Sequence, residues 1–206
     1  LVNSVVDIPE KFFVRVGMMN PMYMPRIRDN LLKSFESSKV FKFLHIPVQS
    51  GSDKVLNDMK RGHTSQTFRE IVKKTKEKFP NFTISTDIIV GFPSETEEDF
   101  MDTYNLINLL DISYLHVFTY SERDNTKALK LSPIVPKDVR AKRSKKLHIL
   151  SRIKREKFYD NFVGKEKYAL FESIRNGEII GHTDNYIKVH ADGDISLLNT
   201  VQKVNI

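Results

Sequence analysis

Apolar and polar positions follow two different periods along the first 120 residues. Short runs of β-branched and aromatic residues, typical of buried strands, are followed by segments with apolar residues three and four positions apart, typical of amphipathic helices. The predicted strands are 12–16, 42–48, 82–90 and 112–120, and the predicted helices are 25–36, 53–59, 66–79 and 96–110. This alternation predicts an α/β fold with parallel strands joined by right-handed crossovers.

The pattern changes after two prolines, Pro133 and Pro136. A long basic helix is predicted over 137–160. Short strands then follow, separated by turn signals such as Asn176-Gly177 and Asp192-Gly193. We therefore expect three parts: an α/β part at 1–136, a connecting helix at 137–160 and a small antiparallel β-barrel at 161–206.

Composition indicates a soluble globular chain, with 40% hydrophobic and 29% charged residues. No apolar run approaches the roughly 20 residues that span a bilayer, and the first residues do not resemble a signal peptide. These features favour a cytoplasmic location without a membrane partner. The first residue is Leu1 rather than Met, which suggests a fragment of a longer chain.

The chain has no cysteine, which excludes disulfides and thiolate-bound metals or iron–sulfur clusters held by its own residues. Its six histidines are scattered, so the sequence predicts no metal site. The net charge is +7, and residues 137–167 alone carry twelve Lys or Arg against four acids. Such a basic stripe indicates a polyanionic partner, although a solvated helix face is an equally good interpretation.

Polar residues follow the predicted strands at the edge where α/β proteins bind ligands. The stretch TDIIVGFPSETEEDF, residues 86–100, joins a strand to a helix through a glycine turn. Either Ser94 or Thr96 is expected to cap that helix, and the acids behind the cap suit its positive end. A plain strand-to-helix connection is the alternative interpretation.

Two charged side chains within the predicted strands also stand out. Asp87 lies inside a β-branched run, so we expect its carboxylate to pair with Arg15 or Arg123. His45 is expected to be a satisfied core histidine.

Four stretches together resemble the radical S-adenosylmethionine tRNA methylthiotransferases. They are LHIPVQSGSDKVLNDMKRGHT (44–64), ISTDIIVGFPSETEEDF (84–100), LHVFTYSERDNTKAL (115–129) and GHTDNYIKVH (181–190). The branch that modifies threonylcarbamoyl-adenosine beside the anticodon looks closest. The resemblance implies the later strands of a partial TIM-type barrel, followed by a TRAM-like β domain that binds tRNA. Asn125 stands where the family usually has Gly.

The resemblance also implies cofactors and roles. The cofactors are S-adenosylmethionine and 4Fe-4S clusters whose ligands lie outside these residues, and the partner is the tRNA anticodon stem-loop. No catalytic residue is assigned to this chain, which is expected to be inert alone. The expected cofactor-binding residues are Gln49, Ser50, Ser52, Asp87, Val90, Gly91, Phe92 and Arg123. The expected RNA-binding residues are Arg140, Lys142, Arg143, Lys146, Arg152, Lys165, Lys167, Tyr186 and Lys188.

Some assignments have structural alternatives. Ser52 is expected to cap the helix behind it as well, and Tyr186 also suits a barrel core. Two rival functions remain open: methylthiolation of a ribosomal-protein aspartate, and a non-catalytic RNA-binding module. The first predicted strand is an unpaired edge, which favours association with a second copy of the chain.

Overall fold

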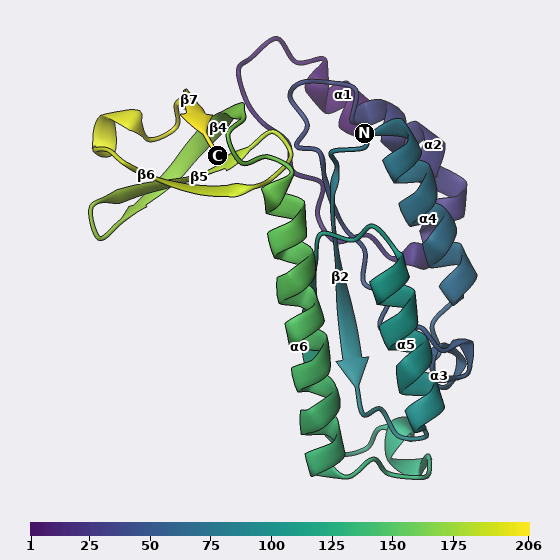
Figure 1. Cartoon of the computed structure of the whole chain (residues 1–206). Coiled ribbons are helices and arrows are strands. Elements are labelled where there is room, and N and C mark those ends of the chain that lie inside the picture. The colour runs from purple at the N-terminus through teal and green to yellow at the C-terminus, as the bar shows by residue number, and fades with distance from the viewer.

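A computed structural model describes all 206 residues and contains two separate sheets (Figure 1). The first sheet is parallel and has the order β1-β2-β3. Its strands are β1 (Phe43–His45), β2 (Thr83–Val90) and β3 (Tyr114–Thr119). The predicted parallel α/β arrangement is therefore confirmed for these three strands.

Six α-helices and three short 3-10 turns accompany the sheets. The helices are α1 (Val2–Val6), α2 (Met24–Ser34), α3 (Asp53–Asp58), α4 (Ser65–Lys78), α5 (Glu97–Leu109) and α6 (Lys137–Asp160), and the turns are η1 (Pro21–Tyr23), η2 (Lys127–Lys130) and η3 (Ile195–Leu197). Thr64 and Thr96 each form a capping box, which fixes the starts of α4 and α5. Thr96, and not Ser94, is thus the cap of α5. None of the helices is both long enough and apolar enough to cross a lipid bilayer.

The segment predicted as a first strand, 12–16, is not a regular strand. It makes a single parallel bridge, Val14 to Val40, and a second bridge joins Met18 to His45. Of these five residues only Val16 is buried. An extended segment with a partner on one side only gains few ladder hydrogen bonds, which explains its irregular course.

The predicted strand 42–48 is also shorter than expected. The Ile46 N–H still donates to the Ser85 carbonyl, but the Val48 N–H, the next donor that faces β2, donates to the Thr86 hydroxyl, so the regular ladder stops at His45. Pairing resumes as a single bridge between Gln49 and Ile88.

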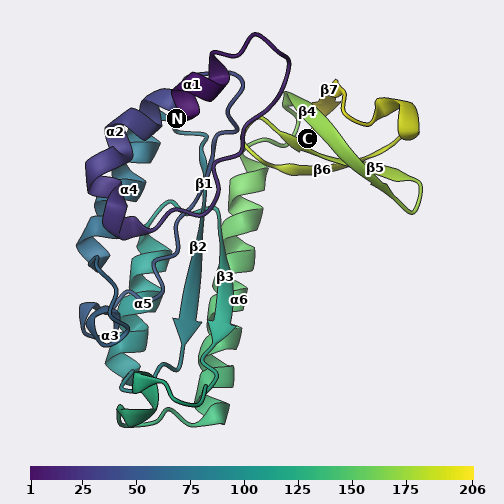
Figure 2. The ribbon, with the colours of Figure 1, turned by 180° about the vertical axis from the view of Figure 1, so that it is seen from behind.

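The main core lies between the parallel sheet and its helices, where 23 buried residues form one cluster. Helix α6 packs along β3, the edge strand, and inserts Leu147 and Leu150 into this core. The Ser151 hydroxyl accepts a hydrogen bond from the Leu115 N–H at 2.9 Å and donates one to the Leu115 carbonyl at 3.0 Å. Figure 2 looks onto the opposite face of the sheet, which the helices leave uncovered.

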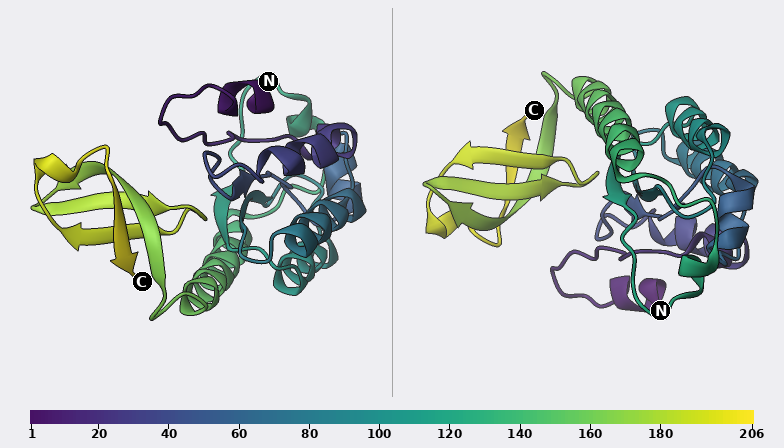
Figure 3. Two further views of the ribbon diagram at one scale, coloured as in Figure 1. Left: turned by 90° about the horizontal axis from the view of Figure 1, so that it is seen from above. Right: turned by 90° about the horizontal axis from the view of Figure 1, so that it is seen from below.

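The second sheet lies within residues 166–205, is antiparallel and has the order β6-β5-β4-β7. Its strands are β4 (Glu166–Arg175), β5 (Glu178–Thr183), β6 (Lys188–Asp192) and β7 (Val201–Asn205). The edge strands β6 and β7 do not pair, so the predicted barrel is instead an open sheet, bent at a bulge between Phe171 and Ser173. We call residues 161–206 the antiparallel unit; it lies beside the end of α6 (Figure 3).

The antiparallel unit contacts the amino ends of β1 and β2 through the turn after β5. The Lys42 N–H donates to the Asp184 carbonyl at 2.7 Å, and the Asn185 amide donates to the Asn81 carbonyl at 3.1 Å. The Tyr186 ring lies 4.5 Å from that of Phe43. The antiparallel unit therefore docks at the end of the sheet opposite to the carboxyl ends of the strands.

Candidate functional site

A cavity of about 420 Å³ opens at the carboxyl ends of the parallel strands. It brings together three residues expected at a cofactor site: Gln49 after β1, Asp87 on β2 and Arg123 after β3. The other lining residues are Ile89, Phe118, Thr119, Tyr120, Ser121, Thr126 and Ala128. Its size and its mixture of apolar walls with a few polar groups are typical of small-ligand sites.

Gln49 is held at the cavity by strained backbone. Its φ of 73° lies in the left-handed region, which a residue with a side chain rarely adopts. Two hydrogen bonds fix it, because its N–H donates to the Asp87 carbonyl and its own carbonyl accepts from the Ile89 N–H, both at 2.9 Å. Its side-chain amide makes no hydrogen bond within the chain, so donor and acceptor are free for a ligand.

Asp87 pairs with a histidine and not with an arginine. Its carboxylate lies 3.1 Å from His45 Nε2, while His45 Nδ1 lies 2.7 Å from the Ser85 hydroxyl. The predicted pairing with Arg15 or Arg123 is therefore wrong. The Arg15 guanidinium instead lies over the Phe43 ring, 5.0 Å from its centre.

His116, which the sequence analysis did not single out, faces the same group. It lies opposite Asp87 in the β2–β3 register. Partial burial of the ring lowers its pKa below 6.5 although the Asp87 charge raises it. The signal was present in the alternation of Tyr114, His116 and Phe118, which places all three side chains on one face of β3.

Ser50 and Ser52 point away from the cavity. The Ser50 hydroxyl is 3.1 Å from that of Thr103, and Ser52 caps α3 as expected while donating to Asp99 at 2.6 Å. Burial alone would raise the pKa of Asp99, but hydrogen bonds from Lys54, Ser52 and Thr96 outweigh it and hold this pKa well below 3.8. Both serines therefore tie the start of α3 to α5 and do not line the cavity at the carboxyl ends; Ser52 borders a separate polar cavity of about 470 Å³.

Val90, Gly91 and Phe92 form the turn beside the cavity and do not line it. Val90 is fully buried, and Gly91 has a φ of 75° with its N–H donating to the Glu95 carboxylate at 2.7 Å. Phe92 packs edge-on against Tyr120, a cavity residue, with 5.4 Å between ring centres. The turn thus supports the cavity wall from outside.

Arg140 and Arg143 were expected to bind RNA phosphates, but both are buried and engaged within the chain. Arg140 donates to the Tyr120 carbonyl at 3.0 Å and to Glu122 at 2.6 Å. Arg143 pairs with Glu95 at 2.6 Å; burial raises the pKa of that carboxyl, against the effect of the Gly91 N–H and Arg143. These pairs fasten α6 to the Gly91 turn through Arg143 and to the segment after β3 through Arg140, so phosphate contacts by either arginine would require breaking them.

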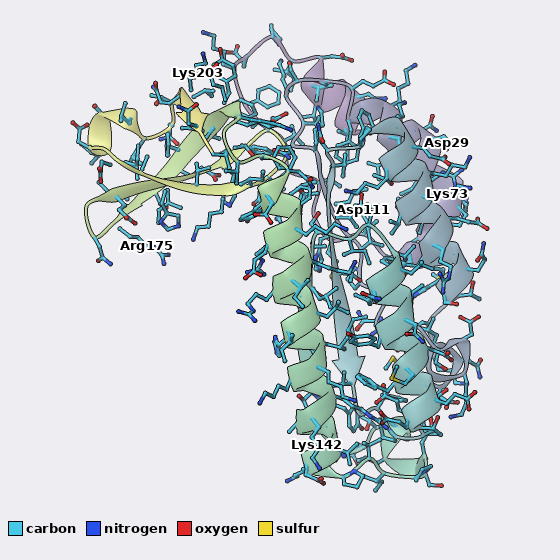
Figure 4. All side chains as sticks on the ribbon, in the orientation of Figure 1. Asp29, Lys73, Asp111, Lys142, Arg175 and Lys203 are labelled. Carbon is cyan, nitrogen blue, oxygen red and sulfur yellow. The ribbon has the colours of Figure 1, made fainter.

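The other predicted RNA-binding cations are exposed, except Lys167, which is half-buried. Lys142, at the end of α6 remote from the antiparallel unit, projects into solvent (Figure 4). Lys167 is bound to Asp184 at 2.8 Å, and Tyr186 stacks on His182 with 4.3 Å between ring centres. The exposed predicted cations are Lys142, Lys146, Arg152, Lys165 and Lys188.

A larger cavity of about 780 Å³ lies between residues 9–13 and the antiparallel unit. It contains none of the residues expected to bind the cofactor. The smaller cavity at the carboxyl ends therefore remains the candidate ligand site.

Comparison with known proteins shows the family of the chain. Residues 6–107 match the family model described as the Radical SAM superfamily. The chain belongs to this superfamily. It is 41% identical over 92% of its length to a probable threonylcarbamoyladenosine tRNA methylthiotransferase of Methanothermobacter thermautotrophicus, and 40% identical over 95% to its counterpart in Archaeoglobus fulgidus. The resemblance to the radical SAM methylthiotransferases is thereby confirmed.

The radical SAM chain spans less than half of these relatives, 45% and 46% of their lengths. Its fold resembles that of the radical SAM enzyme coproporphyrinogen III oxidase from Escherichia coli. The TM-score is 0.55 at 18% identity, covering 69% of this chain and 32% of that one.

The residues present fit one of the two cofactors that the superfamily implies. The free amide of Gln49 and the guanidinium of Arg123 suit the polar groups of S-adenosylmethionine. An iron–sulfur cluster does not fit, because the chain has no cysteine to ligate it.

Proposed function

We propose that this chain is part of a tRNA methylthiotransferase that acts on C2 of threonylcarbamoyl-adenosine beside the anticodon. The convergence of Gln49, Asp87 and Arg123 at one cavity is the observation that carries the proposal. The names of the relatives at about 40% identity supply its substrate class.

In this proposal the chain binds and orients S-adenosylmethionine. The iron–sulfur clusters are held by residues outside this chain. S-adenosylmethionine, when bound, supplies the methyl group and the radical chemistry. Arg123 is suited to hold the cofactor carboxylate in a bidentate manner, and Gln49 can donate to and accept from its polar groups. Ile89, Phe118 and Tyr120 supply apolar surface at the cavity wall.

The exposed cations of α6 and the antiparallel unit are proposed to bind the tRNA backbone. Lys142, Lys146 and Arg152 lie along α6, and Lys165 and Lys188 lie on the antiparallel unit. Contacts of this kind provide affinity and position without reading sequence.

Cofactor binding is tested by calorimetric titration of the 206-residue chain with S-adenosylmethionine. Arg123→Ala and Gln49→Ala should each weaken binding about tenfold, since each removes a charge-assisted or paired hydrogen bond. Arg175→Ala removes an exposed arginine from the antiparallel unit and is the matched control (Figure 4). If the wild-type chain takes up no S-adenosylmethionine, the assignment of the cavity is wrong.

RNA binding is tested with an anticodon stem-loop at several salt concentrations. The double variant Lys142→Ala/Arg152→Ala should reduce the slope of log affinity against log salt by about 2. Lys73→Ala/Lys74→Ala, on α4, should leave it unchanged. RNA affinity without cofactor affinity would favour the RNA-binding module, and preference for an aspartate-containing ribosomal protein would favour the protein-modifying alternative.

A further inference from the structure

A group of three potential metal ligands lies on the uncovered face of the parallel sheet. His45, Asp87 and His116 come from β1, β2 and β3 in turn, so each neighbouring strand contributes one. One ligand atom of each residue lies within 4.8 Å of those of the other two. We infer that these three side chains bind one divalent transition-metal ion, such as Zn²⁺.

Sheet register places the three ligands on one face of adjacent strands, within two positions of one another. Asp87 lies directly opposite His116, and His45 lies opposite Ser85, two positions before Asp87 on the same face. Ligands carried by hydrogen-bonded strands keep their spacing better than ligands carried by loops. The backbone therefore preorganises the group.

The spacing between the first two ligands suits a shared ion. His45 Nε2 and Asp87 Oδ1 are 3.1 Å apart. Two ligands at about 2.0–2.2 Å from one ion are separated by roughly 2.8–3.1 Å in octahedral geometry and by roughly 3.3–3.6 Å in tetrahedral geometry. The His116 ring is exposed, with its centre 5.5 Å from that of His45, so a change of rotamer can bring it into the same shell.

A hydrogen bond to Ser85 orients the His45 ring. His45 Nδ1 lies 2.7 Å from the Ser85 hydroxyl, which turns Nε2 toward Asp87. Metal-binding histidines generally have such a partner on their second nitrogen, and it fixes the ring and its tautomer. When His45 Nδ1–H donates its hydrogen bond to the Ser85 hydroxyl, the Nε2 lone pair faces the Asp87 carboxylate. A cation bound by both atoms removes the repulsion between them.

The ligand set indicates the kind of ion and its accessibility. Two imidazoles and one carboxylate suit Zn²⁺, Co²⁺ or Fe²⁺ rather than Ca²⁺ or Mg²⁺. The site opens onto the uncovered face and borders the cavity through Asp87, so coordination positions remain for water or a ligand. This inference depends on these side chains alone and not on the proposed tRNA-modifying function.

The test uses Co²⁺ absorption spectroscopy and Zn²⁺ calorimetry on the 206-residue chain. The chain has no thiolates, so a visible Co²⁺ spectrum would report nitrogen and oxygen ligands. One equivalent should bind, and Asp87→Asn and His116→Gln should each weaken binding at least tenfold. His190→Gln, an exposed histidine of the antiparallel unit beside Glu178, is the matched control and should bind like wild type.

Circular dichroism separates loss of binding from loss of fold. His116 is exposed, so His116→Gln keeps the fold and decides the outcome even if Asp87→Asn unfolds. Absence of a saturable site, or equal affinity in His116→Gln and wild type, would overturn the inference.

Discussion

Gly91 shows how a single residue sets the wall of the cavity. A Cβ on this residue would lie 2.3 Å from Cγ of Arg140, and its φ of 75° disfavours any side chain. The glycine lets α6 approach the turn closely enough for Arg140 to reach Tyr120. The turn therefore depends on the absence of a methyl group at one position.

Gly91→Ala should lower the free energy of unfolding by about 2–4 kcal/mol, because a clash adds to backbone strain. Gly164→Ala is the matched control, since Gly164 has the same φ of 75° with no atom within 4 Å of the added Cβ. It should cost only about 1 kcal/mol. Urea denaturation measures both, and equal costs would show that contact with Arg140 is unimportant.

Asp99 makes stability depend on pH. Its pKa in the folded chain lies below the ordinary 3.8, so the ionised carboxylate favours folding at every pH above 3.8. Asp99→Asn should cost about 2 kcal/mol near neutral pH, and this difference should shrink as pH falls below 3.8. Asp102→Asn, an exposed aspartate on the same helix, is the control and should change little. A pH-independent difference would contradict the assigned hydrogen bonds.

At the scale of elements, α6 supplies hydrogen-bond partners to the free edge of the parallel sheet. β3 is the edge of the sheet, and Ser151 satisfies both the N–H and the carbonyl of Leu115. A hydroxyl that donates and accepts is one of the few side chains able to do this from a helix. The helix thus covers part of an edge that would otherwise be free to pair.

Ser151→Ala should destabilise the chain by about 2 kcal/mol or more, because two buried backbone groups of one residue lose their partners. Hydrogen exchange at the Leu115 amide should become faster than in wild type. Ser144→Ala, half-buried on the same helix and without a side-chain hydrogen bond, should stay within about 0.5 kcal/mol of wild type. Unchanged exchange at Leu115 would contradict this role.

Elements with local signals were predictable from the sequence. Apolar spacing located α4 and α5 to within about two residues, and strand ends located Gln49 and Arg123 at one cavity. Features that depend on residues far away in the sequence could not be predicted. The burial of Arg143 depends on Glu95, 48 positions earlier, and the irregular 12–16 segment depends on having a single neighbour.

At the scale of the whole molecule, the two sheets are joined by α6 and by one turn. Asn185 is buried in that turn, donates to Asn81 and accepts from the Thr183 hydroxyl at 2.8 Å. The sequence predicted the separation of the two sheets. It did not predict this contact, because the residues involved are about 100 positions apart.

Asn185→Ala should loosen this contact, because it removes the hydrogen bond to Asn81 and the partner of Thr183. We expect the radius of gyration from small-angle X-ray scattering to rise while circular dichroism stays unchanged. Asn161→Ala, at the exposed end of α6, is the control. An unchanged radius would show that α6 alone fixes the position of the antiparallel unit.

Helix α6 separates the cavity from the antiparallel unit by 24 residues, or about 36 Å. Its first turns contact Tyr120 at the cavity, and its last residues pack against Ile187 of the antiparallel unit. A free nucleoside in the cavity cannot reach the far cations, whereas a polymer can engage both ends at once. Binding at both ends of α6 would therefore select ligands by their length. This selection needs no contact with a base.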